Sequence, residues 1–354
     1  MTLETFAHEV SKRESTRQRI VEGVMTPRQV EKLAKRARVP FGYLFLPEPP
    51  VLSVPTIPDL RRTQDALPLS DDFFEVLEDM LAKQIWYADY LNEAGAQNLA
   101  FVGKFRDATI RSVASIVKDM REVLGVTDLD RSRSSDPSAY FSRLSAKAEI
   151  AGVLVVKSSF VKGATKRGLS EREFRGFALS HPTAPLVFVN GKDAEVAAVF
   201  TLIHELAHIW IGVSGVSDIS PKNTRSVERV CNAVAGEVLV PGHDFVKRWE
   251  ADPDVAVLAK HYRVSRLVIA RRALDRGFVD QDFYERIRQG STAVKKDGAP
   301  TALVTIPIRN SKKFTKIVVA EAMSGQVLLR EAARLLNVRP DTVVALGKGR
   351  ESDG

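Results

Sequence analysis

The sequence predicts an α+β protein that is mostly helical, with a small sheet packed on one buried helix and on a second helix that follows it. Most long stretches, including those that flank this central region, repeat apolar residues at the three- and four-residue spacing of a helix. Two short runs are instead rich in β-branched residues and bounded by breakers, which is typical of strands. The most apolar helical stretch, residues 196–211, contains the run His-Glu-Leu-Ala-His and is followed by Gly212 as a stop signal.

The composition limits the class of protein. A chain of 354 residues with 44% hydrophobic residues is long enough for two or three domains with cores of their own. Its one cysteine, Cys231, excludes a disulfide within the chain and fits a reducing compartment, and we interpret it as a small buried side chain. The first residues include Glu4 and Glu9 and lack the apolar run of a secretory signal. We therefore expect a cytoplasmic protein with no membrane partner.

The formal net charge of +8 is concentrated at the two ends of the chain. Residues 1–38 carry nine Lys and Arg against five Glu, and residues 301–350 carry nine against three acidic residues. Residues 39–300 are balanced. Basic ends favour contact with DNA or with an acidic protein such as a toxin, and a solvated surface is the alternative. The pattern singles out no individual nucleic-acid-binding residue.

Residues 1–50 predict a small helical region, and residues 51–68 predict a proline-rich linker. Thr26 and Pro27 supply the N-cap and the first residue of a helix. Residues 25–50 resemble the last two helices of a Cro/repressor-type helix-turn-helix domain, whereas the segment before them is too short for the usual first three helices. We therefore expect a partial helix-turn-helix region.

Residues 69–145 predict a helical region that leads into the sheet. Apolar spacing indicates three helices, over residues 73–93, 106–124 and 138–148. Strands are predicted over residues 149–156 and 186–189. The second strand directly precedes the most apolar helix, where an edge strand could pair with an extended peptide backbone. A purely structural strand is the alternative.

The central helix carries the residues with the clearest chemistry. Residues four apart lie on one face of a helix, so His204 and His208 can point two imidazoles at one metal ion. Glu205 lies about 100° around the helix, where it can reach a water on the metal without binding the metal itself. This arrangement can activate water for attack on a peptide carbonyl. A transmembrane helix is excluded, because residues 196–213 would place two histidines and a glutamate in the bilayer.

A zinc site of this kind needs a third protein ligand, and Glu228 is the candidate. It lies on a predicted helix over residues 224–239, after a polar loop. Asn232 follows one turn later on the same face and could accept the second N–H of a zinc-bound histidine. Zn²⁺ is the ion expected for two His and one Glu, although manganese can occupy such a site. The alternatives for the third ligand are Glu237, Asp218 and His243.

The central region resembles the ImmA/IrrE metallopeptidase family over residues 145–280. The resemblance rests on three runs, which cover residues 177–190, 200–208 and 228–241. It implies that His204, His208 and Glu228 bind zinc and that Glu205 is the general base. Members of the family are intracellular bacterial or phage enzymes, and several of them cut a helix-turn-helix repressor. The resemblance therefore implies a protein substrate of that kind.

Other polar residues give weaker signals. His181, in a Ser-His-Pro run before the second strand, could stabilise the oxyanion of a tetrahedral intermediate. A loop histidine without such a role is the alternative. His243 and Tyr262 are further candidates with less support, and His8 has no partners in view.

The C-terminal part of the chain predicts more helices. We place the metallopeptidase core at residues 146–284, a linker at residues 285–300 and a basic helical region at residues 301–354. Within the core, residues 259–277 have the rhythm of a helix, a turn and a second helix. That pattern could present arginines to DNA, although a packing role is the better interpretation. The arginines are Arg266, Arg271 and Arg272.

Together these patterns predict an intracellular zinc endopeptidase that cuts one specific protein target. The alternative is a non-catalytic regulator, either a DNA-binding protein or the antitoxin of a toxin–antitoxin pair, in which the zinc core is a scaffold. Glu205 distinguishes the two, because only the enzyme needs a general base.

Overall fold

The structure is a computed structural model, and it describes residues 2–37, 41–46, 48, 68–217, 226–290 and 302–348. The chain divides into two compact units, Met1–Val54 and Pro55–Gly354. The linker predicted over residues 51–68 lies almost wholly outside the described residues. The other predicted domain boundaries stay predictions.

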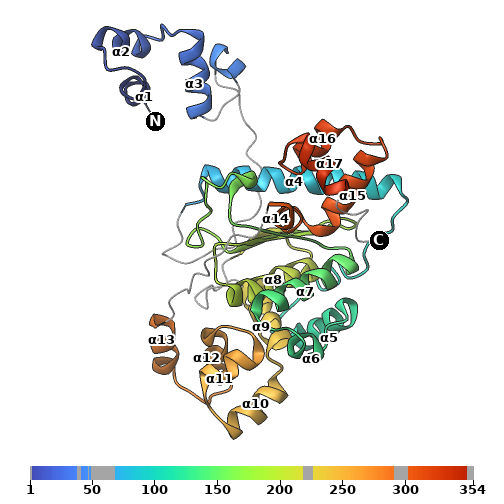
Figure 1. Cartoon of the computed structure of the whole chain (residues 1–354). Coiled ribbons are helices and arrows are strands. Elements are labelled where there is room, and N and C mark those ends of the chain that lie inside the picture. The colour runs from blue at the N-terminus through green and yellow to red at the C-terminus, as the bar shows by residue number, and fades with distance from the viewer. Residues whose placement is uncertain are drawn as a thin grey trace. The chain divides into compact units, whose positions relative to one another are not determined.

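The N-terminal unit is a small helical cluster (Figure 1). It contains α1 (Leu3–Val10), α2 (Glu14–Val21), α3 (Pro27–Ala37) and the 3-10 helix η1 (Phe41–Phe45). Its core is formed by Phe6, Ala7, Ile20 and Leu33. The helix start predicted at Thr26 and Pro27 is confirmed. The Gln29 backbone N–H donates to Thr26 Oγ1 at 3.4 Å, and Gln29 Oε1 accepts from the Thr26 backbone N–H at 2.8 Å. The resemblance of this unit to a repressor domain stays a prediction.

The second unit is built around a four-stranded mixed sheet with the order β1-β3-β2-β4. β1 (Leu154–Ser158) pairs in parallel with β3 (Leu186–Asn190), and β3 pairs in antiparallel with β2 (Gly176–Leu179). β2 also pairs in antiparallel with β4 (Gly215–Ser217). The central strands are buried throughout, as expected for a sheet with helices on both faces.

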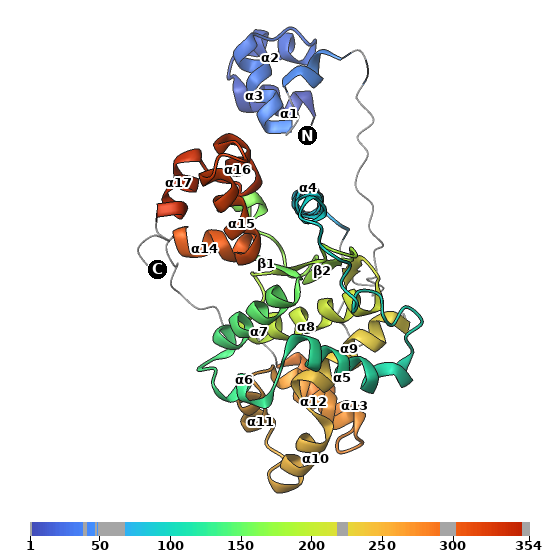
Figure 2. The same ribbon diagram turned by 90° about the vertical axis from the view of Figure 1, so that its right-hand side faces the viewer.

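The two faces of the sheet belong to two different cores. Because side chains alternate along a strand, Val187 and Val189 of β3 point to one face, and Leu186 and Phe188 point to the other. The first face packs on α7 (Pro137–Ala151) and α8 (Glu195–Ile211), and α9 (Ser226–Leu239) packs on α8. The second face is covered by α4 (Asp71–Glu93) and the C-terminal helices (Figures 1 and 2). The predicted mostly helical α+β fold is confirmed.

The remaining helices surround this central arrangement. Between α4 and β2 lie η2 (Ile110–Ser112), α5 (Val113–Leu124), α6 (Asp128–Ser132) and η3 (Val161–Gly163). After α9 come α10 (Gly242–Ala251), α11 (Val255–Tyr262), α12 (Arg266–Asp275) and α13 (Gln281–Gln289). The C-terminal helices are α14 (Ala302–Arg309), α15 (Lys312–Met323), α16 (Leu329–Leu335) and α17 (Pro340–Lys348). No described helix combines the length and the hydropathy that a membrane span requires.

The central helix α8 is buried on all sides, as its sequence predicted. Gly212 ends it in the left-handed conformation with φ 79°, and the Gly212 N–H donates to the carbonyl of His208 at 2.9 Å. Trp210 anchors the last turn, because its ring stacks on Phe101 and its Nε1 donates to Asp119 Oδ2 at 2.8 Å. The helix therefore has one fixed rotation, which sets the direction of its histidines.

Some predicted elements have other limits in the structure. The strand predicted over residues 149–156 begins only at Leu154, because α7 continues to Ala151 and Gly152 ends it with φ 109°. The β-branched Ile150, which favoured a strand, is 84% exposed on that helix. The linker predicted over residues 285–300 is helical as far as Gln289 in α13, and residues 291–300 lie outside the described part of the chain.

The sheet also differs from the prediction in two ways. It contains β2 and β4 in addition to the two predicted strands, which are present as β1 and β3. The strand before the central helix, β3, was proposed as an edge strand for a peptide, but it lies between β1 and β2. Both of its edges already carry hydrogen bonds, so it has a purely structural role.

Candidate metal centre

Three side chains from two neighbouring helices meet at one point. His204 and His208 lie one turn apart on α8, and Glu228 lies in the first turn of α9, which packs along α8. The Nε2 atoms of the two histidines are 3.2 Å apart. Glu228 Oε2 lies 3.2 Å from His204 Nε2, and Glu228 Oε1 lies 3.0 Å from His208 Nε2. The spacing of the motif and the packing of α9 thus bring the three predicted ligands together.

This triangle has the size that a zinc ion requires. Ligand atoms about 2.1 Å from a tetrahedral zinc ion are about 3.4 Å from one another. The three separations of 3.0–3.2 Å are close to that value. Two imidazole nitrogens and one carboxylate are also a donor set that zinc accepts, so the residues present fit the ion.

The ionisation of these groups favours metal binding. All three side chains are fully buried. Burial alone would raise the pKa of the Glu228 carboxyl, but the facing imidazoles of His204 and His208 lower it to about 2. Burial lowers the pKa of His208, although Glu228 opposes this shift. A carboxylate and a neutral imidazole are the forms that bind a metal.

Glu205 lies beside the triangle without joining it. It follows His204 on α8, is fully buried and is not part of the three-residue cluster. Its carboxylate lies against Gly176, where a Cβ atom would come within 2.9 Å of Glu205 Oε1. Because Gly176 has no side chain, the Glu205 carboxylate can occupy the space next to the start of β2.

Asn232 lies one turn after Glu228 on α9, as predicted, but its hydrogen bond to a histidine is not formed. Its Oδ1 atom is buried and accepts no hydrogen bond from the described part of the chain. His204 Nδ1 is likewise buried without a hydrogen-bond partner there. The role of Asn232 toward a zinc-bound histidine stays a prediction.

His181 is not one of the three residues that meet at this centre. It follows β2, the strand that starts at Gly176 next to Glu205. The Nδ1 atom of His181 instead faces the backbone N–H groups of Thr183 and Ala184, at 3.3 and 3.2 Å. The histidine thus stabilises its own turn, and its role as an oxyanion group finds no support in the geometry.

None of the other candidate residues in the described part of the chain belongs to the triangle of ligands. Glu237 accepts hydrogen bonds from the Gly242 N–H at 2.8 Å and from Arg272, which fixes the end of α9. His243 is exposed on α10, and Tyr262 donates its hydroxyl to Asp244 at 2.8 Å. Asp218 lies outside the described residues. His8 is exposed in the last turn of α1.

Cys231 is a structural residue. Its side chain is fully buried on α9, and burial raises the pKa of its thiol well above the usual value, helped by the negative charges of Glu228 and Glu205. A thiol is nucleophilic only as the thiolate. The interpretation of this cysteine as a small buried side chain is confirmed.

The comparison with known families agrees with this geometry. Residues 148–274 match the family model Peptidase_M78, described as the IrrE N-terminal-like domain. The match supports an ImmA/IrrE-family metallopeptidase domain in this region. The matched segment contains α8, the triangle of ligands and Glu205. Residues 310–349 match a second model, a domain of unknown function, DUF8813. No curated protein and no solved structure matched the chain.

Two residues near Glu205, Gly176 and Thr201, were not singled out from the sequence. Gly176 and Thr201 shape the space around Glu205, and a Cβ at position 176 would lie 2.7 Å from Thr201 Cγ2. A single glycine carries no periodic signal, so the sequence alone could not have marked it.

Of the arginines considered for DNA, Arg271 pairs with Asp275 at 2.9 Å and Arg272 pairs with Glu237. These two contacts favour the packing role.

Proposed function

We propose that the protein is a zinc-dependent endopeptidase that hydrolyses a peptide bond in one specific protein target. One observation carries this proposal. Two histidines and a glutamate form a buried triangle of zinc-ligand size, and a second glutamate lies beside it. A structural zinc site would need four closed ligands and no neighbouring carboxylate, whereas a catalytic site keeps one position open.

The residues of the chain divide the work of hydrolysis. His204, His208 and Glu228 would hold the zinc ion, which acts as a Lewis acid and lowers the pKa of water. Glu205 takes a proton from the attacking water as the new carbon–oxygen bond forms. It then gives the proton to the leaving nitrogen as the carbon–nitrogen bond breaks. Its carboxylate lies against Gly176 and is not part of the group of three ligands.

A narrow choice of substrate agrees with the burial of the site. The three ligand side chains and Glu205 are all fully buried, so a peptide segment must fit the site closely to reach them. We infer a single target, and the resemblance to the ImmA/IrrE family favours a helix-turn-helix repressor. The reaction would take place in the cytoplasm, where the repressor and a reduced Cys231 are both found.

The experiment that tests this proposal compares cell proteomes in the presence of the wild type and of Glu205→Gln. The variant keeps the shape and the ligands of the site but removes the general base. The proposal predicts at least one protein that is shortened only in the presence of the wild type, with new termini at one position. Identical proteomes in the presence of the wild type and of Glu205→Gln would reject the proposal of an endopeptidase.

A non-catalytic regulator or antitoxin is the second candidate. In that protein the basic ends would bind DNA or a toxin, and the zinc core would be a scaffold. The buried carboxylate of Glu205 favours the enzyme over this candidate, because a scaffold gains nothing from a second buried charge beside the ligands. The scaffold predicts that Glu205→Gln behaves as the wild type in cells and that His204→Ala does not.

A further inference from the structure

The last three helices form a compact group of their own. α15, α16 and α17 each pack against the other two. Their shared core contains Val318, Ala332, Leu336 and Val343, all of which are fully buried. The group coincides with the matched domain of unknown function at residues 310–349.

The connection between α16 and α17 is a tight turn. α16 ends at Leu335 and α17 begins at Pro340, so four residues join them. Asn337 in this turn adopts the left-handed conformation with φ 53°, which asparagine tolerates better than most residues. Two short helices joined by a turn of three or four residues, with a third helix packed across both, form a helix-turn-helix arrangement.

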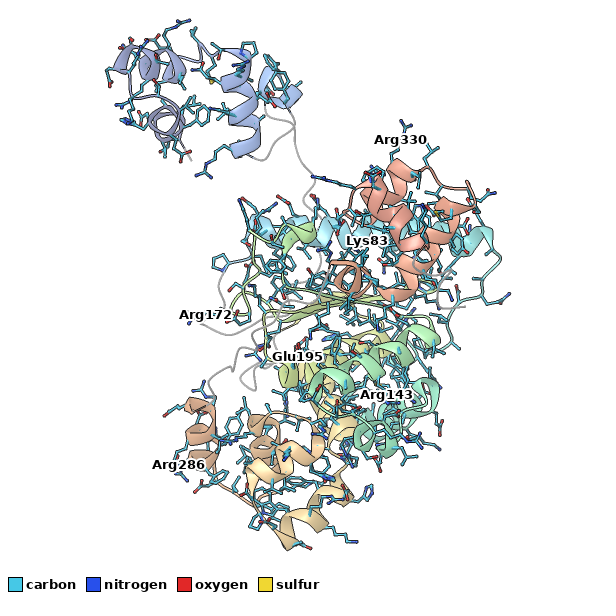
Figure 3. The ribbon with its side chains drawn as sticks, in the orientation of Figure 1. Lys83, Arg143, Arg172, Glu195, Arg286 and Arg330 are labelled. Atoms are coloured by element: carbon cyan, nitrogen blue, oxygen red, sulfur yellow. The ribbon has the colours of Figure 1, made fainter. Side chains whose placement is uncertain are left out.

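The turn is held firmly against the rest of the second unit. Asn337 Nδ2 donates to both carboxylate oxygens of Asp79 on α4, at 2.9 and 3.0 Å. Asp79 also pairs with the buried ammonium of Lys83, which lies between α4 and the C-terminal helices (Figure 3). Asn310 Nδ2 donates to the carbonyl of Leu336 at 3.0 Å. The helix-turn-helix is therefore fixed to α4 and to Asn310.

The outer surface of this group is basic and without carboxylate partners. Four cations are exposed on α16, on the turn and on α17, and none forms an ion pair with a carboxylate of the described residues. They are Arg330, Arg334, Arg339 and Lys348. Figure 3 shows Arg330 pointing outward from α16. Residues 302–348 contain eight Lys and Arg against three acidic residues, so the surface as a whole attracts anions.

The contrast with α11 and α12 strengthens this observation. Those helices are joined by a similar turn, in which Arg263 has φ 58°. There two arginines have partners within the protein, because Arg263 donates to the Ser134 carbonyl at 3.0 Å and Arg272 pairs with Glu237. The four C-terminal cations, in contrast, form no ion pair with a described carboxylate.

We propose that α15–α17 is a site for double-stranded DNA. α17 enters the major groove as the recognition helix, with the exposed side chains of Asp341 and Ala345 toward the bases. Arg330, Arg334 and Arg339 contact phosphates on either side of the groove. α17 carries few polar side chains for reading base edges, so phosphate contacts dominate and the sequence preference is modest. This function is separate from peptide hydrolysis and does not depend on the zinc site.

The first test measures DNA binding of the full chain by fluorescence anisotropy, with a labelled 30-base-pair duplex of mixed sequence between 50 and 200 mM salt. Arg334→Ala with Arg339→Ala should weaken binding roughly tenfold and reduce the slope of log K against log salt by about 2, because each lost phosphate contact removes about 0.9. Arg172→Ala with Lys260→Ala is the matched control, since both residues are exposed on other parts of the second unit. The control should bind as the wild type does.

The second test blocks the groove without changing charge. Ala345→Trp places a large ring on the exposed face of α17, and Ala320→Trp places the same ring on the exposed face of α15. Only the first variant should lose DNA binding. Equal binding of the two variants would overturn the proposal, and so would a wild type that does not bind the duplex. Binding that is lost only in Arg28→Ala with Lys32→Ala would also overturn it, by assigning DNA to the N-terminal unit.

Discussion

The carboxylate of Glu205 lies against the backbone of Gly176, so closely that a Cβ atom at position 176 would come within 2.9 Å of Glu205 Oε1. One residue is the candidate general base on α8, and the other starts the strand β2. The contact joins α8 to the sheet and limits where the carboxylate can lie.

Gly176→Ala should displace Glu205 while leaving the ligands in place. The added methyl group would also lie 2.8 Å from the Phe188 carbonyl oxygen, so the strand cannot simply absorb it. A misplacement of about 1 Å can cost roughly a hundredfold in rate. We expect cleavage of the cellular target to fall by that order, with metal content unchanged. Gly236→Ala is the control, because its Cβ would meet only Arg272 at an ordinary 3.6 Å. Equal cleavage by both variants would contradict the role of Gly176.

Glu228 and Glu237 should behave differently when each is replaced by glutamine. Both lie on α9, but only Glu228 faces the two histidines. Glu228→Gln should weaken zinc binding by several orders of magnitude in a chelator competition, because it removes one of three ligands. Glu237→Gln should keep the affinity of the wild type and lower the free energy of unfolding by about 1–3 kcal/mol, because Arg272 loses its charged partner. The opposite order of zinc affinities would make Glu237 the ligand.

Glu149 should make the stability of the protein depend on pH. Its carboxylate accepts hydrogen bonds from Ser311 Oγ at 2.6 Å and from the Lys313 backbone N–H at 3.3 Å, at the start of α15. Burial nevertheless raises its pKa, against the effect of these groups and of the charge on Lys312. A raised pKa means that the folded protein holds the proton more tightly than the unfolded chain does.

The sign of this effect can be measured with Glu149→Gln. Below about pH 4.3, the pKa of Glu149 in the unfolded chain, its ionisation costs the folded protein no stability. The cost grows as the pH rises from there to the higher pKa of the folded protein. Above that pKa the cost is constant. The difference in melting temperature, variant minus wild type, should therefore increase with pH from about 4.3 and then level off. Thermal unfolding of both proteins between pH 4 and pH 8 measures it. A difference that falls with pH would contradict the account.

Asp79 should be essential for holding the C-terminal helices. Its carboxylate pairs with the fully buried Lys83 and accepts from Asn337. Asp79→Ala leaves a buried ammonium without its partner, which costs about 3–5 kcal/mol in the free energy of unfolding. Adding Lys83→Met to this variant should restore much of the loss, because the unpaired charge is removed. Denaturant unfolding of the wild type and both variants checks this. A double variant less stable than Asp79→Ala would show that Lys83 contributes in another way.

The candidate site was predictable because its signal is local. His204, Glu205 and His208 lie within one helical turn and a half, and their chemistry follows from that spacing alone. Glu228 was predictable as the first acidic residue of the next helix. The roles of Asn232 and His181 stay predictions, because the direction of a side chain depends on packing that neighbouring residues in the sequence do not determine.

The fold was predictable where a helix or strand is long. The limits of α8 follow from an apolar run that ends at Gly212, and α4 follows from its apolar spacing. β4 has only three residues, and β2 has only four, so neither carries enough alternation to be recognised. The order of the strands placed β3 in the centre of the sheet, and no local pattern specifies that order.

The contacts that bind the C-terminal helices had no signal in the sequence. Ser311 lies 162 residues from Glu149, and Asn337 lies 258 residues from Asp79. Each residue is unremarkable in its own segment, and the partnership exists only after the chain folds. The exposed cations of α16 and α17 did contribute to the predicted basic C-terminal region, but their turn geometry became visible only in the structure.

The most direct test of the zinc site is the metal content per chain of the wild type, His204→Ala and Glu205→Gln, measured by mass spectrometry after purification without chelators. We expect about one zinc ion in the wild type and in Glu205→Gln, and none in His204→Ala. A folded wild type without bound metal would contradict it. So would a Glu205→Gln variant that loses the metal, because that carboxylate would then be a ligand and not the general base.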